Sequence, residues 1–256
     1  MMNLLRAEWI KLRTVTMNWI LGIIAIAFPL VVTLLTAYFA SGKTDNDDGL
    51  DTNGLVGVLT GTAVVASLLC GVIAAASITS EFGFGTIRPT FAATPRRMRV
   101  IVAKGLVALG FAAIALAIVQ LVGWYAGSTI ADARGATIDL DTLPTGVPAM
   151  VGAVVLGALL ALFGYGLGLI TRSTPAAVAI LIVWPLIAEP LVAQLLVVAT
   201  DNASIRNWTP LQAGFRLVAT DGFVDGPSRV AGGVYFGAFS LALAGFGAWL
   251  VDRRDA

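Results

Sequence analysis

Six long apolar stretches constrain the fold of this chain more than any other feature of its sequence. They cover residues 18–40, 54–79, 101–127, 147–170, 175–199 and 230–251. An α-helix needs about 20 apolar residues to cross the hydrocarbon core of a bilayer, and each stretch exceeds that length. The stretches lack the period-two alternation of an outer-membrane barrel. The sequence therefore predicts an all-α, polytopic membrane protein with six transmembrane helices.

Composition excludes the main alternatives to a membrane protein. Hydrophobic residues make up 58% of the 256 residues and charged residues only 12%, against about 25% charged residues in an average soluble domain. A soluble chain of this size could not bury so much apolar surface. The chain has no His and one cysteine, Cys70, which excludes an intrachain disulfide and Cys–His metal sites. We expect this chain to bind no metal or cofactor and no nucleic acid.

The distribution of Lys and Arg predicts the orientation of the chain in the membrane. With both termini in the cytoplasm, eleven basic residues fall inside and five outside, as the positive-inside rule favours. The inside residues are Arg6, Lys11, Arg13, Arg88, Arg96, Arg97, Arg99, Lys104, Arg172, Arg253 and Arg254; the outside residues are Lys43, Arg134, Arg206, Arg216 and Arg229. An even number of spans agrees with two cytoplasmic termini.

The loops between the spans leave no room for a separate soluble domain. Predicted outer loops cover residues 41–53, 128–146 and 200–229, and predicted inner loops cover 80–100 and 171–174. We therefore expect one transmembrane domain over residues 1–256. The sequence contains no G-x-x-x-x-G-K-[ST] phosphate-binding loop. If ATP drives this protein, another chain must hydrolyse it.

The segment before the first span has the pattern of an interfacial helix. Leu5, Trp9 and Leu12 fall on one helical face, with cations towards the sides. Such a helix lies in the cytoplasmic interface, with Trp at headgroup depth and cations towards phosphates. Its candidate residues are Glu8, Trp9, Lys11 and Arg13. The alternative is a basic flank that only orients the first span.

The inner loop at 80–100 combines an acid, glycines and a threonine with basic residues at its C-terminal end. Its candidate residues are Glu81, Gly85, Thr86, Arg88, Pro95, Arg96 and Arg97. The mixture of apolar and charged residues predicts a short helix on the cytoplasmic surface at about 81–94, ended by Thr94-Pro95. Such a helix could dock into a partner's groove. The alternative is that the cations only anchor the loop to anionic lipid headgroups.

The fifth apolar stretch contains an acid between two prolines. A charge in mid-span costs about 2.5–3.5 kcal/mol on insertion scales, so Glu189 should face the bundle interior, a cavity or a partner. Pro185 and Pro190 can each kink the helix. Glu189 is either a translocation or gating position or a polar contact that sets packing at a kink. Gln120 in the third stretch is a weaker case of the same kind.

Two further features bear on packing. The predicted outer loop 200–229 is partly apolar, and either dips into the membrane as re-entrant helices or folds over the end of the bundle. Small-xxx-small pairs occur at Gly57/Gly61, Gly164/Gly168 and Gly233/Gly237. We expect these pairs to allow close helix packing within one subunit more than to mediate dimerisation.

The order of these motifs resembles the ABC-2 type transporter permeases over essentially the whole chain. The resemblance rests on Glu81, Gly85-Thr86 and Pro95-Arg96-Arg97, on the opening Ala7-Glu8-x-x-Lys11, and on the six-span layout. It implies the membrane subunit of a bacterial ATP-driven exporter in the cytoplasmic membrane, working as a dimer with a second copy or a paralogue. A separate P-loop ATPase would hold ATP-Mg and dock on the 81–97 loop. The chain itself would not be an enzyme.

Two other functions compete with this one. A stand-alone carrier could use Glu189 as a proton or cation site, although one buried acid without His provides few groups for a proton-transfer pathway. A non-transporting membrane scaffold fits the glycine content and the proline-broken span poorly. The apolar spans contain no His and no acid pair, which makes an intramembrane enzyme the weakest reading.

Overall fold

The computed structural model describes residues 2–41, 49–86, 97–220 and 225–254, and within these ranges every regular element is a helix. The α-helices are α1 (Met2–Thr14), α2 (Thr16–Ala40), α3 (Thr52–Gly83), α5 (Arg97–Ala133), α6 (Gly146–Thr171), α7 (Thr174–Val183), α8 (Glu189–Thr200), α9 (Pro210–Phe215) and α10 (Arg229–Arg254). Short 3₁₀-helices are η1 (Leu140–Thr142), η3 (Ala203–Trp208) and η4 (Arg216–Val218), and η2 (Trp184–Ala188) is a π-helix.

Within the described ranges, six helical segments are long and apolar enough to cross a membrane, which agrees with the predicted number. They are α2, α3, α5, α6, α10 and the segment Thr174–Thr200, which joins α7, η2 and α8. Each contains one of the six predicted stretches. Helices α3 and α5 run further than predicted at the end where the inner loop lies, so Glu81 belongs to the last turn of α3.

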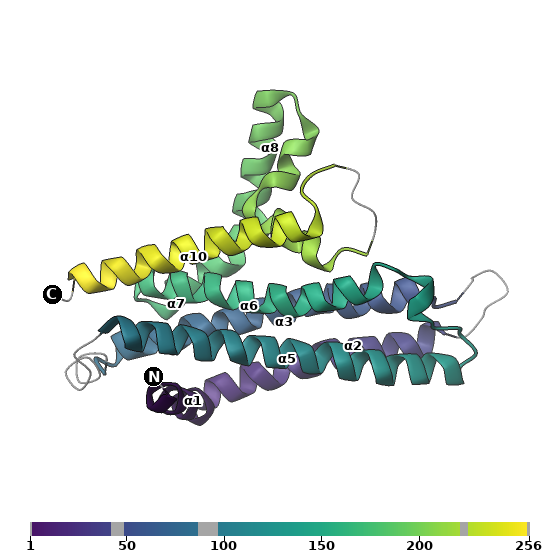
Figure 1. The fold of residues 1–256 in the computed structure, drawn as a ribbon, viewed down its shortest axis with the longest axis horizontal. Coiled ribbons are helices and arrows are strands. Elements are labelled where there is room, and N and C mark those ends of the chain that lie inside the picture. Colours follow the sequence, from purple (N-terminus) through teal and green to yellow (C-terminus); the bar gives the residue numbers. More distant parts are fainter. Residues whose placement is uncertain (1, 42–48, 87–96, 221–224, 255–256) are drawn as a thin grey trace.

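The long helices run side by side, with α3 and α6 at the centre (Figure 1). These two helices approach closely because glycines face each other at their crossing. A Cβ on Gly164 would lie only 2.3 Å from the carbonyl oxygen of Gly71, and one on Gly71 would lie 2.9 Å from that of Leu160. Small side chains therefore hold the centre of the bundle together through backbone contact.

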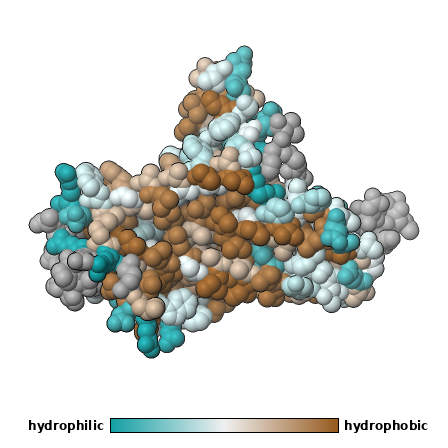
Figure 2. Space-filling model, in the orientation of Figure 1, coloured by the Kyte–Doolittle hydropathy of each residue, from teal (hydrophilic) through white to brown (hydrophobic). Residues whose placement is uncertain are grey.

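The outward surface of the bundle is largely apolar. Figure 2 shows hydrophobic residues over the middle of the face in view and hydrophilic residues towards its ends. Large exposed side chains include Ile23, Ile114, Leu121 and Val151. A soluble protein rarely leaves so much apolar surface uncovered, whereas a lipid-facing surface is expected to be apolar.

Helix α1 is separate from the first span and crosses the direction of the bundle (Figure 1). The chain turns at Val15, where the side-chain amide of Asn18 donates to the carbonyl oxygen of Leu12 at 3.2 Å. Helix α1, the end of α3, the start of α5 and the last turns of α10 all lie at one end of the bundle. We call this the α1 end.

The fifth span is not straight. Helix α7 packs beside the bundle, the chain turns through η2 at Trp184–Ala188, and α8 stands away from the other long helices (Figure 1). Pro185 lies inside η2 and Pro190 in the first turn of α8. Proline removes a backbone donor from a helix, which explains the break in regular α-helical hydrogen bonding here.

The predicted outer loop at 200–229 is largely helical in its described part and folds onto the bundle. It contains η3, α9 and η4, and a Cβ on Gly152 of α6 would collide with the carbonyl oxygen of Leu217. At the start of α10 the Arg229 guanidinium donates to the carbonyl oxygens of Leu217 at 2.6 Å and Ala219 at 2.8 Å. Residues 210–218 therefore pack as a cover against α6 and α10, while η3 packs against α8.

Candidate functional site: a charge cluster at the ends of α1, α3 and α5

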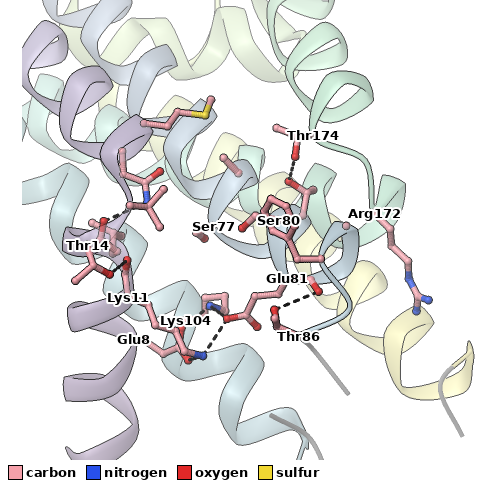
Figure 3. A pocket seen from close by; sticks show the side chains of 18 of the residues that line it. Glu8, Lys11, Thr14, Ser77, Ser80, Glu81, Thr86, Lys104, Arg172 and Thr174 are labelled. Atoms are coloured by element: carbon pink, nitrogen blue, oxygen red, sulfur yellow. Dashed lines mark hydrogen bonds and ion pairs between the residues drawn. The ribbon is translucent and has the colours of Figure 1, made fainter. Parts of the chain in front are cut away.

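Four charged side chains from three helices meet at the α1 end of the bundle (Figure 3). The Lys11 ammonium lies 3.0 Å from a carboxylate oxygen of Glu8 and 3.0 Å from one of Glu81. The Lys104 ammonium lies 2.9 Å from the same Glu81 oxygen and also binds the other carboxylate oxygen of Glu8. These four residues, here called the charge cluster, form a closed ring of alternating sign.

The local folding of each helix brings the four side chains together. Glu8 and Lys11 are three residues apart in α1 and so share one face, which is turned towards the bundle. Glu81 lies in the last turn of α3 and Lys104 in the second turn of α5. The cluster thus joins α1 to the two helix ends that flank residues 87–96, a segment outside the described residues.

Burial makes the pairing within the cluster obligatory. The side chains of Glu8 and Lys104 are 4% and 5% exposed, whereas that of Lys11 is 44% exposed. An unpaired charge at such depth would cost several kcal/mol, so each buried acid in the cluster must have a basic partner. Burial opposes the charge on Lys11, but its hydrogen bonds to Glu8 and Glu81 outweigh this and raise its pKa above the usual 10.5.

A cavity of about 990 Å³ opens beside the charge cluster. Its walls come from α1 and the start of α2, from the last turns of α3, from α5 and from the turn between α6 and α7. The second carboxylate oxygen of Glu81 is buried and has no hydrogen-bond partner among the described residues. The cluster therefore forms one charged wall of a space whose other walls include Leu12, Met17 and Val107.

The end of α3 is also held on its other side. The hydroxyl groups of Thr79 in α3 and Thr174 in α7 are 2.6 Å apart and share a hydrogen bond. The Arg172 guanidinium lies 4.7 Å from the centre of the Phe82 ring. The backbone of Arg172 itself lies in the left-handed region, with φ 53°. The last turns of α3 therefore contact α1, α5 and the α6–α7 turn at once.

The residues predicted for the inner loop lie in different places. Glu81 is buried in the charge cluster, Gly85 takes a positive φ of 67° in the turn after α3, and the Thr86 hydroxyl donates to the Glu81 carbonyl oxygen at 3.5 Å. Arg97 begins α5. Arg88, Pro95 and Arg96 lie outside the described residues. Of the helix predicted at about 81–94, the described part is the last turn of α3 and the turn that follows.

The predicted N-terminal residues separate into two groups. Glu8 and Lys11 enter the charge cluster, while Trp9 and Arg13 lie on the exposed side of α1. Lys104 was not predicted as a site residue, because this lysine was considered only as one of the basic residues that set the orientation in the membrane. A lysine inside a predicted span is itself a signal of a functional or paired position.

Glu189 is buried where the fifth span turns, and its carboxylate accepts hydrogen bonds from three donor groups. One carboxylate oxygen accepts from the backbone N–H groups of Leu211 at 2.8 Å and Gln212 at 2.9 Å. The other accepts from the indole N–H of Trp184 at 2.9 Å. Glu189 therefore caps the start of α9 and fixes the covering segment to the fifth span.

Gln120 lies in the middle of α5 and is almost fully buried. Neither atom of its side-chain amide has a hydrogen-bond partner within the described ranges. It does not contact the charge cluster through any hydrogen bond in those ranges.

Comparison with known proteins places these features in a family. The family model described as "ABC-2 family transporter protein" matches residues 4–195. The match begins in α1 and ends in α8, so it includes all four residues of the charge cluster and Glu189. No curated protein matches the chain.

Proposed function

This chain belongs to the ABC-2 family of transporter proteins, and on that premise we propose that it is the permease subunit of an ATP-driven exporter. It is a multi-pass membrane protein with six apolar helices. Two copies, or one copy and a paralogue, would form the translocation path in a bacterial cytoplasmic membrane with their termini inside. ATP-Mg would be bound and hydrolysed by a separate P-loop ATPase subunit, since this sequence has no phosphate-binding loop.

The charge cluster is the observation that carries the proposed coupling. Its acids and bases connect α1 to the end of α3 and the start of α5, the two helix ends that lead into residues 87–96. An ATPase that docks on this segment would displace both helix ends. Buried ion pairs transmit such a displacement because they tolerate little separation before an unpaired charge is exposed.

The contacts on the far side of α3 extend this transmission. The Thr79–Thr174 hydrogen bond and the Arg172–Phe82 contact link the same last turns to α7, the first half of the broken fifth span. In the proposed cycle, ATPase closure moves the end of α3, and α1 and α7 move with it. The cavity beside the cluster changes shape as a result.

Site-specific photo-crosslinking in the native membrane tests where the ATPase docks. Phe84 lies in the turn after α3 and is 84% exposed, so a photoreactive residue there should crosslink to a P-loop ATPase. The exposed Asp141, at the opposite end of the bundle, is the matched control and should give no such product. Crosslinking of the ATPase at position 141 but not at 84 would contradict the proposed docking face.

A further inference from the structure

A second, smaller hollow lies where α1 turns into α2, and it shares Leu12 and Asn18 with the cavity beside the charge cluster. It has a volume of about 250 Å³ and is formed by α1, α2 and α5. Its lining residues are Trp9, Leu12, Arg13, Asn18, Trp19, Gly22, Ile23, Ile26 and Phe111. We call it the elbow groove. Its volume is below the range of about 300–1,000 Å³ that is typical of small-molecule pockets.

The sequence builds the elbow groove with specific local contacts. The indole N–H of Trp19 donates to the carbonyl oxygen of Arg13 and so closes the turn between α1 and α2. Gly22 and Phe111 both line the groove and lie against each other: a Cβ on Gly22 would lie 3.0 Å from the Phe111 ring, so the glycine lets α2 and α5 pack closely beneath the groove. The floor is thus apolar, and it rests on close contact between Gly22 and Phe111.

The rim of the elbow groove carries two indoles and the positive charge of Arg13. Arg6, Trp9 and Arg13 are spaced i, i+3, i+7 and so share the outward face of α1. Trp9 and Trp19 are 41% and 56% exposed. Glu8 and Lys11 are used in the charge cluster, but the side chains of Arg6 and Arg13 form no ion pair within the described part of the chain.

We propose that the elbow groove binds one anionic phospholipid from the leaflet at the α1 end. One acyl chain lies on Gly22, Ile23 and Phe111, and the phosphate contacts Arg13 and Arg6. Tryptophan is enriched at headgroup depth, and basic pockets beside membrane helices recognise anionic headgroups. This assignment needs only the membrane location of the chain and is independent of any ATPase partner.

Quenching of tryptophan fluorescence by brominated lipids tests the proposal. The purified full chain is reconstituted in phosphatidylcholine vesicles that contain acyl-brominated phosphatidylglycerol or, separately, acyl-brominated phosphatidylcholine at equal mole fraction. We expect stronger quenching by the phosphatidylglycerol, and Trp19→Phe should remove most of the difference. Arg13→Gln should reduce the preference for phosphatidylglycerol about fivefold, the effect of one basic residue near an anionic surface. Arg13→Lys should largely keep it.

Two further variants separate a built site from general attraction to a basic helix. Gly22→Val pushes its side chain against Phe111 and so disturbs the floor, but it keeps both arginines, and it should abolish the preference. Arg206→Gln, on the exposed surface of η3, is the matched control and should change nothing. Equal quenching by the two lipids would overturn the proposal, and so would an unchanged preference in Gly22→Val. Circular dichroism and the elution volume confirm that each variant is folded.

Discussion

At the residue scale, Lys104 gives the clearest test of the charge cluster, because its side chain is buried and paired with two acids. Removing its ammonium in Lys104→Met leaves Glu8 and Glu81 to share Lys11 alone. Breaking a buried pair costs about 3–5 kcal/mol. We expect a clearly lower midpoint of thermal unfolding for this variant in detergent.

The double variant Glu8→Gln/Lys104→Met is the control for this prediction. It removes one charge of each sign and leaves the Lys11–Glu81 pair intact. Replacing both partners of a buried pair costs far less than removing one. The double variant should therefore unfold at a higher temperature than Lys104→Met; a lower or equal midpoint would mean that the ring of charges does not act as a unit.

Glu189 gives a second prediction at this scale. Glu189→Leu leaves the N–H groups of Leu211, Gln212 and the Trp184 indole without an acceptor, at about 1–3 kcal/mol for each group left buried. Glu189→Gln retains an oxygen for the two backbone groups and should be milder, close to Trp184→Phe. Thermal unfolding of the three variants checks this order.

The same variants separate a packing role for Glu189 from a proton site. With all three donors on its carboxylate, we expect the residue to fix α9 to the fifth span. Glu189→Gln should therefore leave any pH dependence of transport unchanged. A loss of pH dependence together with normal stability would favour the stand-alone carrier.

At the element scale, the contact between α3 and α6 depends on Gly164. A methyl group there would meet the Gly71 carbonyl oxygen at 2.3 Å, and backbone cannot move aside as a flexible side chain can. Gly164→Ala should destabilise the bundle by about 1–3 kcal/mol, the usual cost of overpacking. Gly61→Ala is the matched control, since nothing lies within 4 Å of that position. Equal unfolding midpoints for the two variants would show that the crossing is not tightly packed.

The lengths of the continuous apolar stretches predicted the spans well, because lipid imposes one simple rule on them. Each stretch had to be apolar over its whole length, so hydropathy located α2, α3, α5, α6 and α10. The break in the fifth span was signalled by Pro185 and Pro190, but the direction of α8 was not, since it depends on packing against distant segments. The end of α3 was predicted too early and the start of α5 too late, because polar residues at a membrane surface remain helical.

The charge cluster could be predicted only in part. Glu8, Lys11 and Glu81 were chosen separately, for two different segments, and nothing local to either segment reveals that they meet. Lys104 is 96 residues from Glu8, and their contact arises from the packing of α1 across α5. Two of the partners of Glu189 were equally hidden, because they are backbone N–H groups at the start of α9, 22 and 23 residues later.

At the scale of the whole molecule, the predicted orientation can be tested by labelling. In a Cys70→Ala background, a cysteine at the exposed Phe84 should react with a membrane-impermeant reagent only after cells are permeabilised. A cysteine at the exposed Asp141, at the opposite end of the bundle, should react in intact cells. The reverse pattern would place the α1 end outside and contradict docking of a cytoplasmic ATPase there.

The central claim is that this ABC-2 family protein works with a separate ATPase, and co-purification tests it most directly. The tagged chain is extracted at native levels from its own membrane in mild detergent, and the proteins that elute with it are identified by mass spectrometry. We predict a P-loop ATPase in stoichiometric amount. Its reproducible absence, from a protein shown to be folded, would contradict the account.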